Sequence, residues 1–210
     1  DDKSYAIVTY EDDDGRPRRG LYDLSRKELI IKDACELEEK YDCVYVSYDY
    51  YAILYDYKNR KPLTRPFVDG RDVHQAPLMF SYKDYRNSNN EYYIYSNVNQ
   101  KEYGPFRRVG DGINYDNLVV VEALDEQNFE RIFDVDKGDF VGEEKFQYIL
   151  PENRFFCKAQ KPNGAYYLFD NLRQKCLCEI DDTASIRTLC DFGNMSLFVF
   201  KYPNGGFNIY

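Results

Sequence analysis

Few residues of this chain have the types and spacing that catalysis requires. The chain has a single histidine, His74, so a multi-histidine metal site is excluded. Its neighbours at 71–75 are mostly polar, which is typical of a surface loop. No glycine-rich phosphate loop, GxSxG elbow or HExxH motif is present. The many acidic residues offer no assignable pair for glycoside hydrolysis. We therefore expect no catalytic residue and no cofactor.

One turn carries closely spaced acids. Asp134, Asp136 and Asp139 form the motif DxDxGD with Gly138, and carboxylates on one turn can converge on a hard cation. An EF-hand loop would place its glycine one position later and would end in Glu, where this chain has Lys145. Because the same turn recurs elsewhere without the extra acids, we interpret it as a repeat turn with solvated charges. The three aspartates remain weak metal candidates.

The cysteines do not form a recognisable metal or redox motif. Cys176 and Cys178 are two residues apart on a predicted strand, so they face the same side, and no CxxC is present. We interpret all six as reduced thiols that pack as small hydrophobic side chains: Cys35, Cys43, Cys157, Cys176, Cys178 and Cys190.

Aromatic residues are the strongest binding candidates. The chain has 22 Tyr and 14 Phe but no Trp. Exposed tyrosines suit protein or sugar recognition, because the ring is amphipathic and loses little entropy when immobilised; the alternative is that they fill the core. The candidate binding residues are Tyr50, Tyr51, Tyr92, Tyr93, Tyr166, Tyr167, Phe198 and Phe207.

Charge narrows the classes of partner. A net charge of −9 disfavours binding to nucleic acid and electrostatic attachment to membranes, and no apolar run reaches the length of a membrane span. The run Asp12–Asp13–Asp14 is expected to be a solvated hairpin tip. With 43% hydrophobic residues the chain is expected to be globular, and we expect one domain over 4–210, with 1–3 a tag or processing remnant.

These candidates must be positioned by a repeated element. A triplet of an aliphatic residue, an aromatic residue and usually Asp recurs, with aromatics 33, 40, 38, 36 and 41 residues apart. The copies are Leu21–Tyr22–Asp23, Leu54–Tyr55–Asp56, Ile94–Tyr95–Ser96, Ile132–Phe133–Asp134 and Leu168–Phe169–Asp170, and the chain stops on Ile209–Tyr210. Repeat units are expected at about 4–40, 41–75, 76–114, 115–153, 154–190 and 191–210.

Each unit is predicted to be an antiparallel meander of three or four strands. Asp-Gly and Asn-Gly tips such as 14–15 and 163–164 supply the positive φ of tight hairpins. Two adjacent apolar residues point to opposite faces of a strand, so both faces of each sheet must be covered. This pattern favours a propeller-like all-β fold, with an open stacked β-array as the alternative. Residues 33–37 have the spacing of a capping box and are expected to allow one helical turn.

Two stretches resemble bacterial WG repeats. They are Arg19–Gly20–Leu21–Tyr22–Asp23 through Lys27–Glu28–Leu29–Ile30, and Arg131–Ile132–Phe133–Asp134 through Lys137–Gly138–Asp139–Phe140 with the later Lys145–Phe146. The chain lacks the family's Trp and keeps its Gly only at Gly20. The resemblance implies a β-repeat module for binding or scaffolding, with no catalytic residue to transfer.

Two functions remain open from the sequence. The first is a non-catalytic protein-interaction scaffold, and the second is a carbohydrate-binding module or glycoside-processing propeller. The last unit stops after its second strand, which would leave an unpaired apolar edge that includes Phe198 and Phe207. We therefore expect the C-terminal hairpin to bind a protein partner or a second copy of the chain, or to be the cut end of a longer array.

Overall fold

The computed structural model describes residues 4–87, 89–113, 117–126, 128–152, 155–181, 185–192, 195–201 and 207–209, with side chains up to residue 181 except that of Pro77. The chain divides into two compact units. The first comprises Asp1–Val73 and Pro77–Val109, and the second comprises His74–Ala76 and Gly110–Tyr210. Each unit is described separately.

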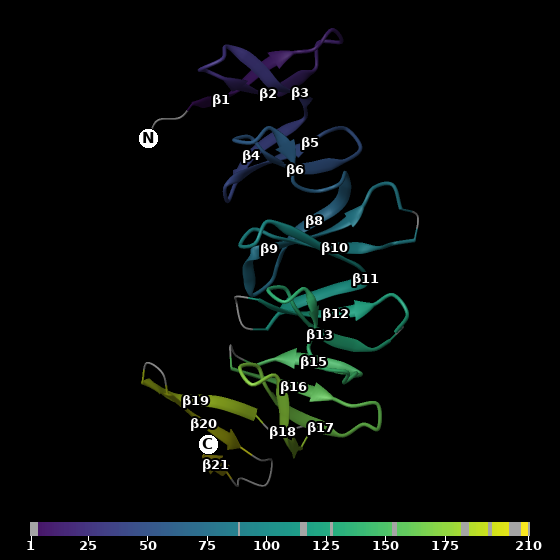
Figure 1. The fold of residues 1–210 in the computed structure, drawn as a ribbon, viewed down its shortest axis with the longest axis vertical. Coiled ribbons are helices and arrows are strands. Elements are labelled where there is room, and N and C mark those ends of the chain that lie inside the picture. The colour runs from purple at the N-terminus through teal and green to yellow at the C-terminus, as the bar shows by residue number, and fades with distance from the viewer. Residues whose placement is uncertain are drawn as a thin grey trace. The chain divides into compact units, whose positions relative to one another are not determined.

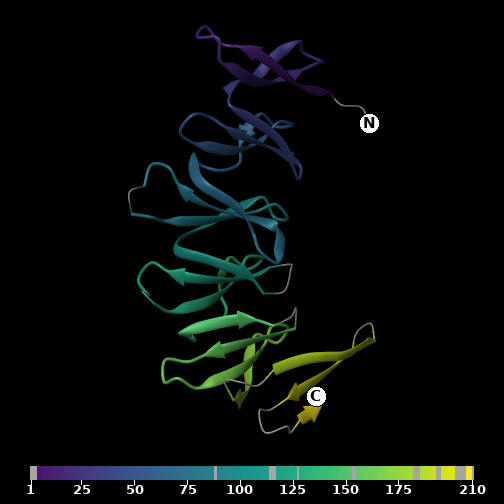
Figure 2. The same cartoon turned by 180° about the vertical axis from the view of Figure 1, so that it is seen from behind.

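The first unit contains antiparallel sheets only (Figure 1, Figure 2). One sheet has the order β1–β2–β3, and the other strands follow the order β4–β5–β6–β8–β9–β10–β11, with β7 paired to β6. The strands are β1 (Tyr5–Glu11), β2 (Pro17–Asp23), β3 (Glu28–Ala34), β4 (Glu36–Lys40), β5 (Cys43–Ser47), β6 (Ala52–Asp56), β7 (Lys61–Pro62), β8 (Phe67–Val73), β9 (Ala76–Asp84), β10 (Tyr92–Ser96) and β11 (Lys101–Gly112). Strands β9 and β11 each have residues in both units.

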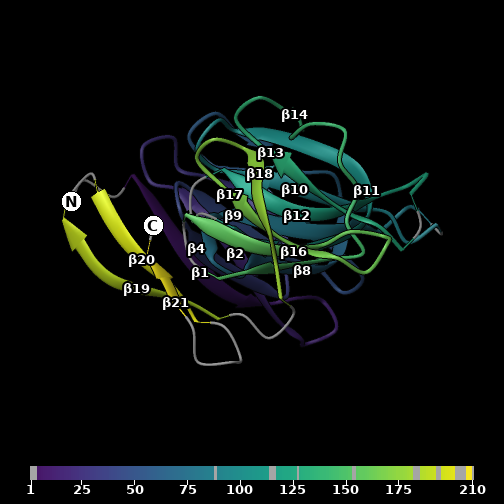
Figure 3. The ribbon, with the colours of Figure 1, turned by 90° about the horizontal axis from the view of Figure 1, so that it is seen from below.

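The second unit repeats the pattern. The sheet β15–β16–β17–β18 is a four-stranded antiparallel meander, which is the size of a propeller blade. The strands β19, β20 and β21 form a three-stranded sheet in chain order (Figure 3). The strands are β12 (Leu118–Ala123), β13 (Glu130–Asp134), β14 (Asp139–Phe140), β15 (Tyr148–Pro151), β16 (Phe156–Gln160), β17 (Tyr166–Asp170), β18 (Lys175–Ile180), β19 (Ser185–Phe192), β20 (Met195–Lys201) and β21 (Phe207–Ile209).

The predicted all-β class and the antiparallel meanders are confirmed. Each of the five triplets ends the returning strand of a hairpin, in β2, β6, β10, β13 and β17. The tips close as expected, since Gly15 and Gly164 have φ of 73° and 87°. The predicted single domain over 4–210 and the choice between ring and open array stay predictions.

Strands β4 and β15 lie at the ends of the expected units 4–40 and 115–153, and each pairs with the strand that follows it, β5 and β16. One detail differs from expectation. The helical turn predicted over 33–37 is wrong, because this segment runs from β3 into β4 with a bend at Cys35. Asp33 has a φ of 57° and the Cys35 amide donates to the Ser47 carbonyl, so a sheet contact replaces the local capping bond.

The covered faces predicted from the triplets are visible inside each unit. In β6, Ile53 and Tyr55 pack into a core with Leu21 and Ile31, whereas the intervening Leu54 packs into a separate core. That second core is largely aromatic and contains Phe67, Phe80, Tyr82, Tyr93 and Tyr95. The sheet of β4–β6 is therefore buried on both faces, which explains why aliphatic and aromatic residues alternate without a polar residue.

The same arrangement holds in β17 of the second unit. Leu168 packs with Ile180 on one face of the sheet. Phe169 packs on the other face with Ile132 and Phe146. A strand of this type carries two apolar surfaces, so its stability depends on a neighbouring sheet for each.

The aspartate of the triplet caps the turn that follows it. Asp23, Asp56, Asp134 and Asp170 end β2, β6, β13 and β17, and all four are buried. Asp134 Oδ1 accepts hydrogen bonds from the backbone amides of Asp136 and Lys137, and Asp170 Oδ1 accepts them from Leu172 and Arg173. The carboxylate thus satisfies turn amides that would otherwise lack partners.

A left-handed residue lies four positions after each triplet end. These residues are Lys27, Arg60, Gln100, Gly138 and Gln174, with φ between 52° and 71°. Two of them reach back to the preceding repeat in the same unit: Arg60 donates to Asp23, and Gln174 Nε2 donates to Asp134 Oδ2 at 2.9 Å. The turn therefore also links successive sheets.

We predict that Asp134→Asn destabilises the protein by about 1–3 kcal/mol, because Asn cannot accept all of the charge-assisted hydrogen bonds at this buried position. Burial alone would raise the pKa of Asp134, but hydrogen bonds from Gln174 and Lys137 outweigh it and lower that pKa. The contribution is present above the pKa of the unfolded state and is lost as pH falls through the lower folded-state pKa. Urea unfolding at pH 7 and at acidic pH measures both effects.

The exposed neighbour Asp136 provides the control. Asp136→Asn should change the free energy of unfolding by less than about 0.5 kcal/mol. Equal effects of the two substitutions would contradict the assigned role of Asp134.

Candidate functional site

Two adjoining hollows in the first unit contain predicted binding residues. The larger, which we call the Tyr–Asp cleft, has a volume of about 620 Å³. It is lined by Asp12, Asp13, Asp14, Arg18, Asp33, Tyr48, Asp49, Tyr50 and Tyr51. The smaller, the apolar hollow, measures about 190 Å³ and is lined by Tyr45, Ser47, Tyr48, Tyr50, Tyr51, Ala52, Phe67, Val68, Asp69 and Gly70. Tyr48, Tyr50 and Tyr51 line both.

A tight turn between β5 and β6 presents these tyrosines. The amide of Tyr48 donates to the carbonyl of Tyr51 at 2.8 Å and closes the turn. The rings of Tyr48 and Tyr51 lie 4.9 Å apart, and the ring of Tyr85 lies 5.7 Å from that of Tyr51. Tyr50 is 76% exposed. The turn therefore holds a packed aromatic group with one ring directed to solvent.

The acidic side of the cleft is organised by Arg18. Its Nε lies 2.9 Å from Asp12 Oδ2, and its two terminal nitrogens each lie 3.1 Å from an oxygen of Asp49. The hydrogen bond from the Arg16 amide, followed by that from Arg18, lowers the pKa of Asp12. Hydrogen bonds from Arg18 and then Cys35 lower the pKa of Asp49. Both carboxylates are thus kept ionised, and both are already engaged.

The remaining acids differ in how far they are engaged. Asp33 accepts a hydrogen bond from the Tyr10 hydroxyl at 2.9 Å. Asp13 and Asp14 are exposed at the hairpin tip, and no ion pair within the described part of the chain holds either side chain. These two carboxylates are available to a ligand.

The other candidate tyrosines have different surroundings. Tyr93 is buried against Tyr82, with the Arg65 guanidinium 4.0 Å from its ring centre. Tyr92 is half-buried on β10. Tyr166 and Tyr167 lie in the second unit, where Lys158 and Lys161 stand over their rings at 4.9 and 4.5 Å. The side chains of Phe198 and Phe207 lie outside the described residues, so the role of the C-terminal hairpin stays a prediction.

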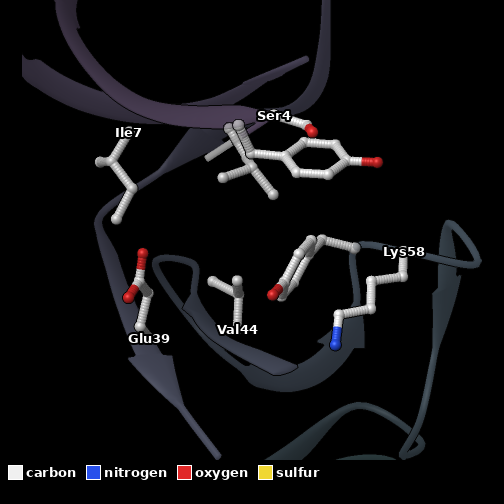
Figure 4. Close-up of a pocket in the computed structure, with 8 residues that line it drawn as sticks. Ser4, Ile7, Glu39, Val44 and Lys58 are labelled. Atoms are coloured by element: carbon white, nitrogen blue, oxygen red, sulfur yellow. The ribbon is translucent and has the colours of Figure 1, made fainter. Parts of the chain in front are cut away.

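A third hollow of about 290 Å³ lies beside the first two sheets (Figure 4). Its lining is mostly apolar and includes Ile7, Leu21 and Val44. Glu39 and Lys58 lie on opposite sides of it (Figure 4), and Lys58 Nζ is 3.4 Å from Asp42. It contains none of the predicted binding residues.

The described residues provide little catalytic chemistry. No group of three His, Cys, Asp or Glu side chains that could hold a metal ion is found among them. The side chain of His74 is 72% exposed, 3.6 Å from Asp111. Of the turn acids, Asp134 is buried while Asp136 and Asp139 are exposed. No helix in the described ranges is long and apolar enough to cross a membrane.

The five cysteines with described side chains are free thiols. Cys43 and Cys157 are buried as expected, but Cys35 is exposed and Cys176 and Cys178 are half-buried. Desolvation raises the pKa of each thiol, to about 11 for Cys43 and about 12 for Cys176. All five are therefore protonated and weakly nucleophilic at neutral pH.

Tyr50 and Tyr51 are binding candidates from the sequence, and that role stays a prediction. Their acidic surroundings do not follow from it: the sequence indicates a solvated tip at Asp12–Asp14 and a helix cap at Asp33, and it does not single out Arg18 or Asp49. The closeness of Asp49 to three tyrosines in the sequence was the one available signal.

Comparisons with known proteins place the chain in no family. No protein-family model matches the sequence, and neither does any curated protein. Among solved structures, Hsv2 from Kluyveromyces lactis is 12% identical with a TM-score of 0.37, over 95% of this chain and 75% of that one.

Two computationally designed proteins also match. Ika8 is 11% identical with a TM-score of 0.36, over 99% of this chain and 68% of that one. Ika4 is 14% identical with a TM-score of 0.34, over 63% of this chain and 84% of that one. At this level of similarity nothing about the ligand follows from the matches.

We predict that Gly70→Ala disturbs the apolar hollow. A Cβ atom at Gly70 would lie 2.4 Å from Phe67 Cε2 and 2.5 Å from Phe80 Cζ, so the two rings would have to move. Overpacking of this kind costs about 1–3 kcal/mol. Urea unfolding measures the loss, and near-ultraviolet circular dichroism reports the changed aromatic packing. Unchanged stability together with an unchanged aromatic spectrum would contradict the described contact.

Proposed function

We propose that the protein is a non-catalytic interaction module whose Tyr–Asp cleft binds a basic segment of a partner protein. The observation that carries this proposal is the composition of the cleft. Five Asp carboxylates and three tyrosines line it, and its one cation, Arg18, is already held by Asp12 and Asp49.

The charge of the cleft favours a cationic ligand. Five carboxylates and one guanidinium give a formal charge of −4 within one hollow. A Lys or Arg side chain can pair with Asp13 or Asp14 and lie over the exposed ring of Tyr50, which adds a cation–π interaction. An anionic or phosphorylated ligand would be repelled.

The adjoining apolar hollow adds a preference for an apolar ligand residue. Because Tyr50 and Tyr51 line both hollows, a ligand residue next to the basic one reaches a surface formed by Ala52, Phe67 and Val68. A basic residue followed closely by an apolar residue is therefore the preferred sequence.

Two further observations support a binding module. The described thiols have raised pKa values, and the resemblance to WG repeats implies a binding or scaffolding role. The stacked β-repeats suit this function because their edges and tips present side chains on a fixed frame.

A fluorescently labelled peptide of Arg and Leu residues tests the proposal by anisotropy. We expect binding that weakens as salt rises from 50 to 300 mM, because exposed charge pairs are screened. The double variant Asp13→Asn with Asp14→Asn should bind roughly three- to tenfold more weakly, and Tyr50→Ala should lose a similar factor.

Asp136→Asn and Tyr148→Ala are matched controls, since both residues are exposed and lie in the second unit. Both should bind like the original chain. Equal binding of a Glu–Leu peptide, or binding that ignores the Asp13 and Asp14 changes, would exclude the proposal. Sugar binding on a glycan array, abolished by Tyr50→Ala, would favour a carbohydrate-binding module instead.

A further inference from the structure

Three of the four buried turn aspartates have a cationic partner. Arg60 pairs with Asp23, Lys137 Nζ lies 3.0 Å from Asp134, and Arg173 lies 2.8 Å from Asp170. A cation beside a buried carboxylate offsets its loss of hydration. The repeat thus provides a positive charge at this position in the first, fourth and fifth copies.

Asp56 in the second copy differs. It is buried, and its oxygens accept hydrogen bonds from the amide and the side chain of Asn59 at 2.9 and 2.7 Å. No Lys, Arg or His in the described part of the chain forms an ion pair with it. Asp56 therefore lacks the direct ion pair that the other three aspartates have, and its cationic neighbours, Lys58 at the cavity and Lys61, act on it only at longer range.

A polar cavity lies beside Asp56. Its volume is about 90 Å³, which corresponds to about three water molecules at roughly 30 Å³ each. It is lined by Asp42, Asp56, Lys58, Asn59, Leu63, Tyr95, Asn97 and Gln100. Apart from Leu63 and Lys58, every lining side chain carries oxygen.

Tyr95 gives an independent indication that this cavity takes a ligand. The side chain is 1% exposed, and its hydroxyl has no hydrogen-bond partner within the described structure. A buried hydroxyl without a partner is costly, and this one borders a polar cavity.

The chemistry of the lining selects a hard cation. Carboxylate, amide and hydroxyl oxygens are the ligands that calcium prefers, and calcium tolerates irregular geometry and water ligands. We propose that this cavity binds a calcium ion between Asp42 and Asp56, supplying the positive charge that Arg or Lys provides in the other repeats.

Two features of the cavity determine how tightly we expect it to bind calcium. Only two carboxylates are present, so the dissociation constant should be on the order of 10⁻⁴ to 10⁻³ M. Lys58 competes, because its ammonium lies 3.4 Å from Asp42. That side chain is 57% exposed, so it can leave the cavity without unfolding any element.

Terbium(III) tests the site, since it replaces calcium in oxygen-ligand sites and emits when a nearby tyrosine is excited. We expect saturable emission from the full chain that calcium displaces. Tyr95→Phe keeps the ring but removes the hydroxyl and should weaken binding several-fold. Asp42→Asn should weaken it at least tenfold, and Lys58→Met should strengthen it several-fold.

Asp42→Asn is the most informative variant, because the Asp42 side chain is 74% exposed and its substitution should leave the fold intact. Asp56→Asn provides a second measurement where the variant folds, and Asp125→Asn, at an exposed position of the second unit, is the matched control that should bind like the original chain. The absence of saturable binding, equal binding by Asp42→Asn, or weaker binding by Lys58→Met would each overturn the proposal.

Discussion

The structure depends on sheets that are apolar on both faces. In β6, the consecutive residues Ile53, Leu54 and Tyr55 alternate between two separate cores. Such a strand cannot bury its apolar surface within its own hairpin, so it requires a sheet on each side. Within each unit, the stability of one repeat is therefore tied to that of its neighbours.

The second constraint is the turn that lets each meander continue. A four-residue turn with a left-handed residue leaves backbone amides without strand partners, and the buried aspartate of the triplet satisfies them. Burying that carboxylate requires a positive charge or several donors nearby. Arg60 and Gln174 fulfil this from the next repeat, which makes the turn both a local cap and a link between sheets.

These two constraints explain which features the sequence predicts. Apolar pairs and Asn-Gly or Asp-Gly tips are local signals, so the strands and hairpins follow from them directly. The helical turn at 33–37 failed because the Ser47 carbonyl, twelve residues beyond Cys35, takes the Cys35 amide in a sheet contact. The Tyr–Asp cleft could not be predicted from local sequence either, because it joins the tip of the β1–β2 hairpin to the β5–β6 turn more than thirty residues later.

Whether an acidic or aromatic side chain stabilises the fold or stays exposed to a ligand depends on its surroundings and not on its residue type. Asp12 caps its own turn and holds Arg18, whereas Asp13 beside it is exposed. Tyr82 and Tyr93 stack in the core, whereas Tyr50 points to solvent. Asp13 and Asp14 therefore stand exposed at the β1–β2 tip, on the lining that they share with the tyrosine turn.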